Sequence, residues 1–203
     1  MKFAATLLAV TAGSAAAFAP TSSFRASTAL EANVVDTLKS LEGPGQVWGA
    51  DGIAVGKEES DFKEFDNFDL YFDRLQSTGV AAELAGAGPF TIFAATNTAV
   101  RSFEKNTGPV TADVLKYSIL SSQVASSAVG SADLSNQAGK SLTYSRKFRK
   151  DFIDDAILGE KTFGPFSDFP VDVACDNGVI HSVGIMLDPD YSAVSGGAGA
   201  TQL

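Results

Sequence analysis

The stretch FTIFAATNTAV, at residues 90–100, decides how this chain folds. Its first six residues are largely apolar on both alternating faces, which predicts a strand that is buried on both sides. A Gly-Ala-Gly-Pro turn precedes it at residues 86–89. Thr96 and Asn97 then end the strand and supply capping side chains for a short helix over residues 98–105. The sequence therefore predicts a buried strand that leads directly into a capped helix.

A second stretch, DNGVIHSVGIMLDP at residues 176–189, predicts a hairpin near the end of the chain. Asn177-Gly178 is a strong signal for a two-residue turn, because both central positions of such a turn need a positive φ. This turn would pair Ala174 with His181 across the hairpin.

His181 is the only histidine and Cys175 the only cysteine, so each is a candidate for a catalytic or ligand role. The predicted pairing puts them on opposite strand faces, and the chain has no Gly-x-Ser-x-Gly motif and no metal-ligand spacing. A histidine on an apolar strand face is usually a core residue that donates a hydrogen bond to a backbone carbonyl. We therefore predict a structural role for His181, no catalytic residue, no metal and no cofactor. The predicted apolar neighbours on its face are Val179, Val183 and Ile185.

Other elements follow from hydrophobic spacing. A helix capped by Ser60 is predicted to end at Gly79, with Phe65 on its apolar face and Asp66 on its polar face. A short helix follows over residues 80–85. Thr111 caps a helix that is predicted to reach Leu120. Short strands are predicted at residues 141–145, 152–158 and 171–175.

The run RKFRK, at residues 146–150, is the one basic cluster of the chain. Such a run is usually the solvated tip of a hairpin, and the acids at 151, 154 and 155 largely neutralise it. The alternative is that Arg146, Lys147 and Arg149 contact an acidic partner or a phosphate. Trp48 is another candidate partner contact, although the favoured interpretation is that it pins the N-terminal extension to the core.

The charge of the chain excludes some partners. The formal charge is −9, and the first 30 residues contain Lys2 and Arg25 but no acid, so the remainder is more acidic still. An acidic domain repels phosphates, which argues against nucleic acid and anionic lipid as partners. With one cysteine, no intramolecular disulfide can form.

Residues 1–30 have the composition of a targeting sequence. A charged start, an apolar segment at residues 3–10 and small residues at 13–17 form a signal peptide, which is too short to span a membrane stably. Phe18-Ala19-Pro20 lies at the expected cleavage site, and a hydroxyl-rich segment without acids follows. This arrangement resembles the bipartite presequence of algae with complex plastids, so the mature chain would begin near Leu30 or Glu31. The alternative is a simple signal peptide with a linker, which would make the protein secreted.

Three short boxes resemble the signatures of the fasciclin domain. The first is TIFAATN at residues 91–97, with Ala95 where the family usually has Pro. The middle box is LKY at residues 115–117, followed by Ser118 where the family often has His. The last box covers residues 177–189. The matching motif positions are Thr91, Phe93, Thr96, Asn97, Tyr117, Asn177, Gly178 and His181.

The resemblance implies an α+β fold, a wedge with a small β-sandwich or barrel of short strands and several helices packed on it. With the resemblance covering a fasciclin-like domain at 60–189, the rest of the chain divides by composition into a presequence at 1–30, an N-terminal extension at 31–59 and a flexible tail at 190–203. Hydrophobic spacing in the extension predicts a short helix from Val34 to Leu41.

The family consists mainly of non-enzymatic adhesion or interaction modules. We therefore expect a protein-interaction module in the plastid, such as a peripheral subunit of a thylakoid or stromal photosynthetic complex. Two alternatives are a secreted adhesion protein and a carrier of a small apolar ligand, lipid or pigment, that uses Phe163, Phe166 and Phe169. No transmembrane segment is expected in the mature chain.

Overall fold

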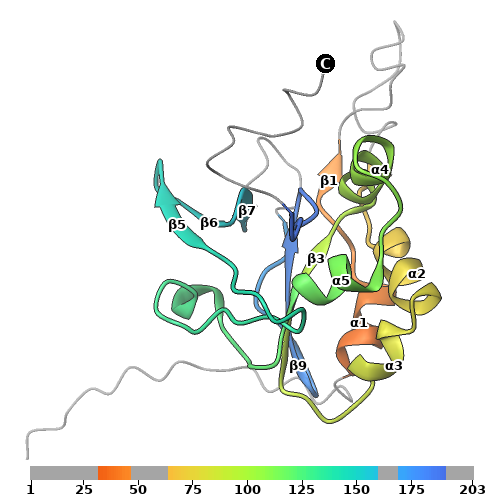
Figure 1. The fold of residues 1–203 in the computed structure, drawn as a ribbon, viewed down its shortest axis with the longest axis horizontal. Helices are drawn as coiled ribbons and strands as arrows, with labels where there is room; N and C mark the ends of the chain where they lie inside the picture. The colour runs from red at the N-terminus through yellow and green to blue at the C-terminus, as the bar shows by residue number, and fades with distance from the viewer. Residues whose placement is uncertain (1–31, 47–63, 160–168, 191–203) are drawn as a thin grey trace, which may run out of the picture.

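The computed structural model describes residues 32–46, 64–159 and 169–190. Trp48, Phe163, Phe166, the predicted presequence and most of the predicted tail lie outside these residues. The described part confirms the predicted α+β architecture, with helices and short strands around a common core (Figure 1).

A four-stranded sheet runs through the middle of the molecule in the order β4-β3-β9-β8. The predicted organising strand is β3 (Phe90–Ala95), and it lies parallel to β9 (Gly178–Val183) over six residue pairs. The short strands β4 (Ile119–Leu120) and β8 (Val173–Cys175) pair antiparallel on either side. Every residue of β9 is buried, as are five of the six in β3, so the two central strands are covered on both faces.

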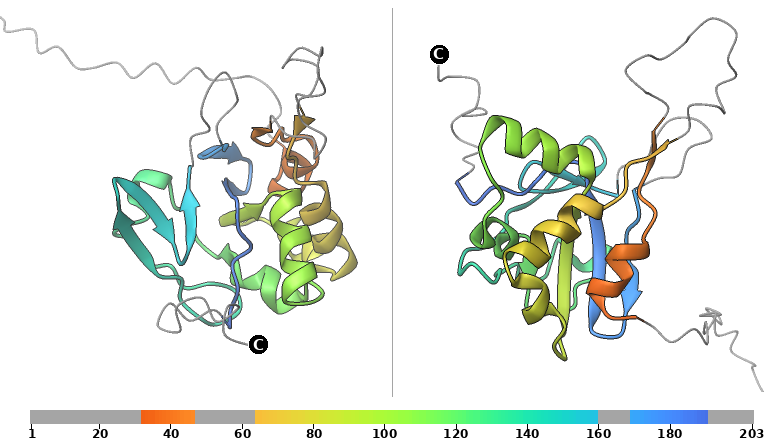
Figure 2. Two further views of the ribbon diagram at one scale, coloured as in Figure 1. Left: turned by 90° about the horizontal axis from the view of Figure 1, so that it is seen from above. Right: turned by 90° about the vertical axis from the view of Figure 1, so that its right-hand side faces the viewer.

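In the described part of the chain, five helices cover one side of this sheet, and the views in Figure 2 agree on their grouping. They are α1 (Val34–Ser40), α2 (Asp69–Ser77), α3 (Val80–Leu84), α4 (Asn97–Asn106) and α5 (Ala112–Tyr117). The predicted helix near residue 34 is therefore present as α1, and it contributes the fully buried Val34 and Leu38 to the same core as the other helices.

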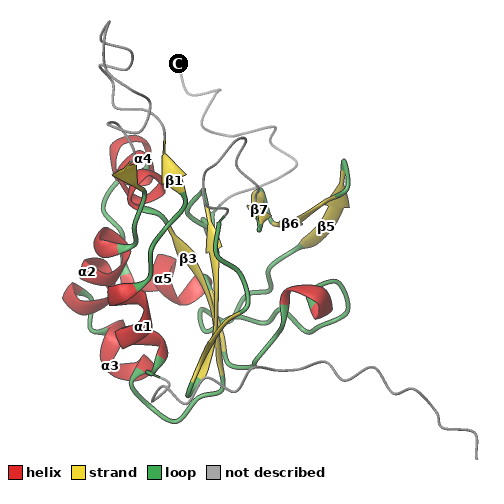
Figure 3. Ribbon diagram, turned by 180° about the vertical axis from the view of Figure 1, so that it is seen from behind, coloured by secondary structure: helices red, strands yellow, loops and turns green. Residues whose placement is uncertain are grey.

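A three-stranded antiparallel sheet lies on the other side, away from the helices (Figure 3). Its strands are β5 (Tyr144–Lys147), β6 (Lys150–Ile153) and β7 (Ala156–Leu158), and β7 contacts β9. The turn at Asp154 and Asp155 divides the single strand predicted over residues 152–158 into two. A short 3-10 helix, η2 (Ser126–Ala128), lies between β4 and β5 in the chain.

Two helix predictions need correction. The helix predicted from Ser60 begins only at Asp69, because Glu64–Phe65 forms strand β2, which pairs with β1 (Gly45–Gln46). Phe65 is 40% exposed, so it does not belong to the buried helix face that its spacing suggested. The helix predicted to reach Leu120 ends at Tyr117, since the next residues pair with β3 as strand β4.

The register predicted for the last hairpin is also wrong. Ala174 pairs with Val179 rather than with His181, and Cys175 pairs with Gly178, so the two turn residues are Asp176 and Asn177. The turn is displaced by one position because Gly178 belongs to strand β9. There an added Cβ would lie 2.3 Å from the carbonyl oxygen of Phe90. The glycine is therefore needed for the close approach of two strands. Ile185, predicted to lie on the buried strand face, follows the end of β9 and is 54% exposed.

Candidate functional site

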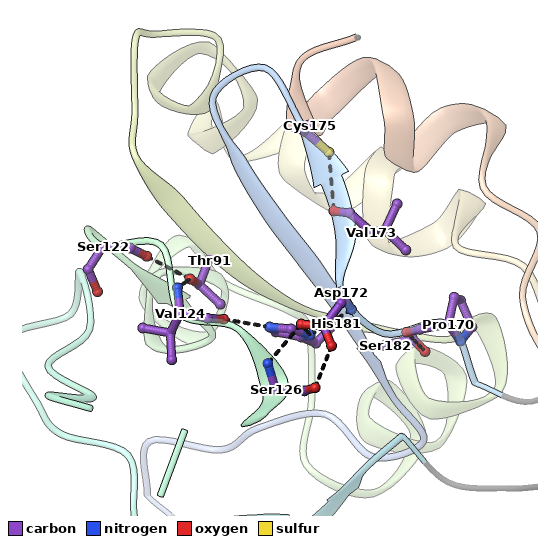
Figure 4. A network of polar contacts seen from close by, with 10 residues as sticks. All are labelled: Thr91, Ser122, Val124, Ser126, Pro170, Asp172, Val173, Cys175, His181 and Ser182. Carbon is purple, nitrogen blue, oxygen red and sulfur yellow. Dashed lines mark hydrogen bonds and ion pairs between the residues drawn. The ribbon is translucent and has the colours of Figure 1, made fainter. Parts of the chain in front are cut away.

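His181 lies at the centre of a polar network between β9 and two loops (Figure 4). Its ring is fully buried, and Nε2 lies 2.8 Å from the backbone oxygen of Val124. The backbone N–H of Asp172 donates to Nδ1 over 3.1 Å, so Nδ1 accepts and Nε2 carries the proton that is donated to Val124. This agrees with the prediction of a core histidine bonded to a backbone carbonyl.

Ser126, Asp172 and His181 lie together, but their contacts differ from those of a catalytic triad. Ser126 bonds to the carboxylate of Asp172 and not to the imidazole of His181. The hydroxyl of Ser126 donates to the carboxylate of Asp172, and the N–H of Ser126 donates to the same carboxylate over 2.8 Å. In a triad the imidazole would accept the serine proton, whereas here Nε2 is bonded to Val124. The arrangement holds loop residues 124–126 and Asp172 against β9, and it offers no activated nucleophile.

Burial and hydrogen bonding set the protonation of this network. Burial lowers the pKa of His181 below its ordinary value, and this outweighs the raising effects of the Val124 carbonyl and Asp172. Burial alone would raise the pKa of the Asp172 carboxyl. The hydrogen bonds from Ser126, helped by the nearby imidazole, nevertheless hold it below its ordinary value. The site is therefore a neutral imidazole beside an ionised carboxylate.

Thr91 and Phe93 occupy the same face of β3 and extend the network. Thr91 Oγ1 donates to the backbone oxygen of Ser122 over 2.6 Å and accepts from the N–H of Val124 over 2.9 Å. The ring of Phe93 stacks on that of His181 with 5.7 Å between ring centroids. Both side chains are fully buried, so they hold the segment 122–124 against the central strands.

Thr96 and Asn97 connect two helices at their N-termini. Thr96 is the N-cap of α4, and its hydroxyl accepts from the N–H of Ala99. Asn97 Oδ1 accepts from the N–H of Leu70 over 2.8 Å, which supplies the cap that Phe68 cannot give to α2. In return the carboxylate of Asp66 accepts from the N–H of Thr98 over 2.9 Å. Asp66 was not identified from the sequence, where it was assigned to the polar face of a helix.

Tyr117 and Ser118 serve the core. Tyr117 donates its hydroxyl to Asp154 over 2.9 Å, and burial followed by this contact raises the pKa of the phenol. Ser118, at the position where the family often has His, is buried; its hydroxyl donates to Leu115 and lies 2.7 Å from the hydroxyl of Tyr71. The side chain at position 118 therefore points inward.

Asn177 connects three parts of the chain that are far apart in sequence. Its Oδ1 accepts from the N–H of Val34 over 2.9 Å, at the start of α1. Its Nδ2 donates to the carbonyl oxygens of Leu84 and Gly86, each over 2.8 Å. Its own carbonyl accepts from the N–H of Phe90 over 2.9 Å. Asn177 therefore fixes the hairpin turn, the N-terminal helix and the entry to β3 together.

The basic run forms the tip of the β5–β6 hairpin, which projects away from the helices (Figure 1). Arg146 and Lys147 end β5, and Arg149 lies in the turn; all three are exposed. Arg146 Nη1 lies 3.3 Å from a carboxylate oxygen of Asp151. Phe148, between the cations, is 93% exposed. It was not among the predicted contact residues, although an aromatic residue inside a basic run is a signal visible in the sequence.

A cavity of about 260 Å³ lies between α4, β7 and the segment after β9. Phe103, Met186 and Leu187 give it apolar walls, and none of its lining residues in the described part of the chain is lysine or arginine. Its remaining lining residues are Ala99, Ser102, Asn106, Thr107, Asp154, Asp155, Ala156, Gly184, Ile185 and Asp188. Neither the cavity nor the hairpin tip involves any of the eight family-motif residues.

Two further observations concern the described residues alone. They contain no group of three or more His, Cys, Asp or Glu side chains that could hold a metal ion. Within the same residues, no helix is long and apolar enough to cross a membrane.

A search of curated proteins found none that matches the chain. The family model described as the fasciclin domain matches residues 66–189, which include β3, β9 and all the motif residues described above. Because this match spans more than half of the 203 residues, the chain belongs to the fasciclin family.

Proposed function

We propose that this protein is a non-enzymatic interaction module that acts in the plastid, where it serves as a peripheral subunit of a thylakoid or stromal complex. Fasciclin domains are typically adhesion or interaction modules without catalysis. The observation that carries the proposal here is the projecting β5–β6 hairpin, whose tip exposes Phe148 among four cations. An exposed aromatic residue beside arginine is the composition of a binding hot spot.

The backbone of the tip supports a role in binding. Phe148 has φ +53° and Arg149 has φ +63°, so both central residues of the turn are left-handed. Such turns favour Asn and Gly, and a bulky residue in this conformation costs about 1–2 kcal/mol. A strained backbone under an exposed aromatic side chain lowers the stability of the fold. Such a residue can compensate for this cost by contacting a partner.

The burial of the motif residues also supports a binding role for the surface. Thr91, Phe93 and His181 are fully buried, and Asn177 is almost so. Their polar atoms bond to backbone groups of the same chain, so they form the scaffold and leave binding to the surface.

The plastid assignment comes from sequence. Residues 1–30 combine a signal peptide with a hydroxyl-rich segment that has no acid, and the chain has no Asn-x-Ser/Thr sequon. The alternative is a secreted adhesion protein, and the experiment must distinguish it from a plastid protein.

The test is localisation of a fluorescent fusion together with mass spectrometry of the mature N-terminal peptide. A start near Glu31 inside the plastid supports the proposal. A start at Phe18 with the protein in the medium contradicts it. The size profile of gently lysed plastids then checks the interaction, because a module bound to a complex elutes with that complex.

A further inference from the structure

We infer that the tip of the β5–β6 hairpin binds the acidic cavity beside α4 in a second copy of this chain. The inference deepens the proposed function and rests on it, since it names a partner for the interaction module. It is carried by two surfaces of the same molecule that match each other in charge, polarity and size.

The tip supplies an apolar side chain surrounded by positive charge. Phe148 is 93% exposed, so almost none of its ring contacts its own chain. Arg146, Lys147, Arg149 and Lys150 surround it in sequence. On a chain of formal charge −9, this is the one basic run, so the tip and the rest of the molecule attract each other.

The cavity supplies the complementary surface. Its walls are apolar, through Phe103, Met186 and Leu187, and Ile185 at its edge is 54% exposed. Every charged residue among the described residues that line it is acidic. Asp154 is bound to Tyr117 and to the N–H of Thr143, whereas the side chain of Asp155 is exposed.

Size favours a side chain over a larger ligand. The cavity of about 260 Å³ is smaller than the ~300–1,000 Å³ of sites for drug-sized ligands. A lipid or pigment therefore fits it poorly, whereas one aromatic ring with cations at the rim suits it.

The positions of the two surfaces allow a closed assembly. The tip lies at the start of β6, and the acids at 154 and 155 lie just past its end. Six residues separate Phe148 from Asp154, so at the rise of a strand one molecule carries both surfaces about 20 Å apart. A two-fold axis can then bring each tip to the cavity of the partner, which makes a self-complementary dimer.

Sedimentation velocity of the full chain over a range of concentrations is the test. We expect reversible self-association that weakens when ionic strength rises from about 0.15 M to 1 M, because the Debye length falls from about 8 Å to 3 Å. A monomer at all concentrations would overturn the inference, and so would association that salt leaves unchanged.

Variants on each side locate the contact. Phe148→Asn keeps a residue suited to the turn, and Ile185→Lys adds a cation at the exposed edge of the cavity. Each is expected to weaken self-association at least tenfold while the chain remains folded by circular dichroism. Lys39→Glu and Asp73→Lys, on exposed positions of α1 and α2, are the charge controls and should associate as the wild-type chain does.

Mixing the two variants gives the decisive result. Ile185→Lys still has a wild-type tip and Phe148→Asn a wild-type cavity, so an equimolar mixture should recover 1:1 dimers that neither variant forms alone. The single changes Arg149→Glu and Asp155→Lys should each weaken self-association. The double variant, which carries both changes in one chain, should restore it because the charges of tip and cavity are then exchanged. No recovery in the mixture would overturn the pairing of tip and cavity. It would leave the proposed function standing, because that proposal is tested by localisation and by the size of the plastid complex.

Discussion

At the scale of the residue, this chain uses its polar motif side chains to hold backbone in place. His181 donates to Val124 and accepts from Asp172, Asn177 bonds to three separate segments, and Thr91 bonds to both Ser122 and Val124. Each of these bonds joins segments that are apart in the chain, so together they tie loops and helices to the central sheet. A buried group of this kind is expensive to remove, because its former partners are left unsatisfied.

Replacing His181 with alanine should therefore destabilise the fold. The change removes a fully buried ring, the stacking on Phe93 and two hydrogen bonds, and we expect a loss of about 2–4 kcal/mol. Denaturant unfolding measures it, with Ile185→Ala as a control at an exposed position that should change little. An unchanged unfolding midpoint would contradict the structural role of His181.

The same residue should make stability depend on pH. Burial holds the pKa of His181 below the ordinary value of 6.5, so the unfolded chain binds the proton more readily than the folded one. Its contribution to stability is complete above pH 6.5 and declines as pH falls toward the depressed folded pKa. Because His181 is the only histidine, the stability slope between about pH 7.5 and 5 should be shallower in His181→Ala. Equal slopes in both proteins would argue against this assignment.

At the scale of the element, the contact between β3 and β9 depends on one missing side chain. Gly178 lies opposite Phe90 in the parallel register, with no room for a Cβ. Gly178→Ala should cost at least about 3 kcal/mol, at the upper end of overpacking effects. Gly79→Ala is the comparison: φ there is +81° but no atom lies within 4 Å of the added Cβ, so about 1 kcal/mol is expected. Equal losses in thermal or denaturant unfolding would refute the close-approach explanation.

The helices α2 and α4 each depend on a residue outside their own sequence. Asn97 of α4 caps Leu70, and Asp66, which precedes α2, caps Thr98. Asn97→Ala should lower the free energy of unfolding by about 1–2 kcal/mol, because it leaves the start of α2 uncapped. Asn106→Ala, at the exposed C-terminal end of α4, is the matched control and should have little effect on the same unfolding curve.

The sequence predicted those elements whose local signals agree with their tertiary contacts. Strand β3, the cap at Thr96 and the exposed basic tip were predicted correctly, because apolar runs, capping residues and charge act locally. The other elements were predicted wrongly, because pairing with distant parts of the chain determines their structure. Phe65 and Ile119 have helical spacing but pair with β1 and β3, and the turn at Asn177-Gly178 moves because that asparagine bonds to α1 and α3.

At the scale of the whole molecule, scaffold and surface are separate. The central sheet and the surrounding network contain all eight motif residues, whereas the hairpin tip and the cavity contain none of them. The cavity could not be predicted, because residues 99–107, 154–156 and 184–188 meet only in the folded chain. The tip could be predicted as exposed, but the exposure and strain of Phe148 required the structure.

The central claim is that the buried motif holds the fold while the exposed tip binds. The measurement that tests it most directly is the native size profile of plastid extracts containing wild-type protein, Phe148→Asn or His181→Ala, below the melting temperature of each. We expect wild type and His181→Ala to migrate in a larger complex, and Phe148→Asn, although at least as stable as wild type, to migrate as a smaller species. Retention of Phe148→Asn in the complex, with loss of folded His181→Ala from it, would show that binding does not depend on the tip.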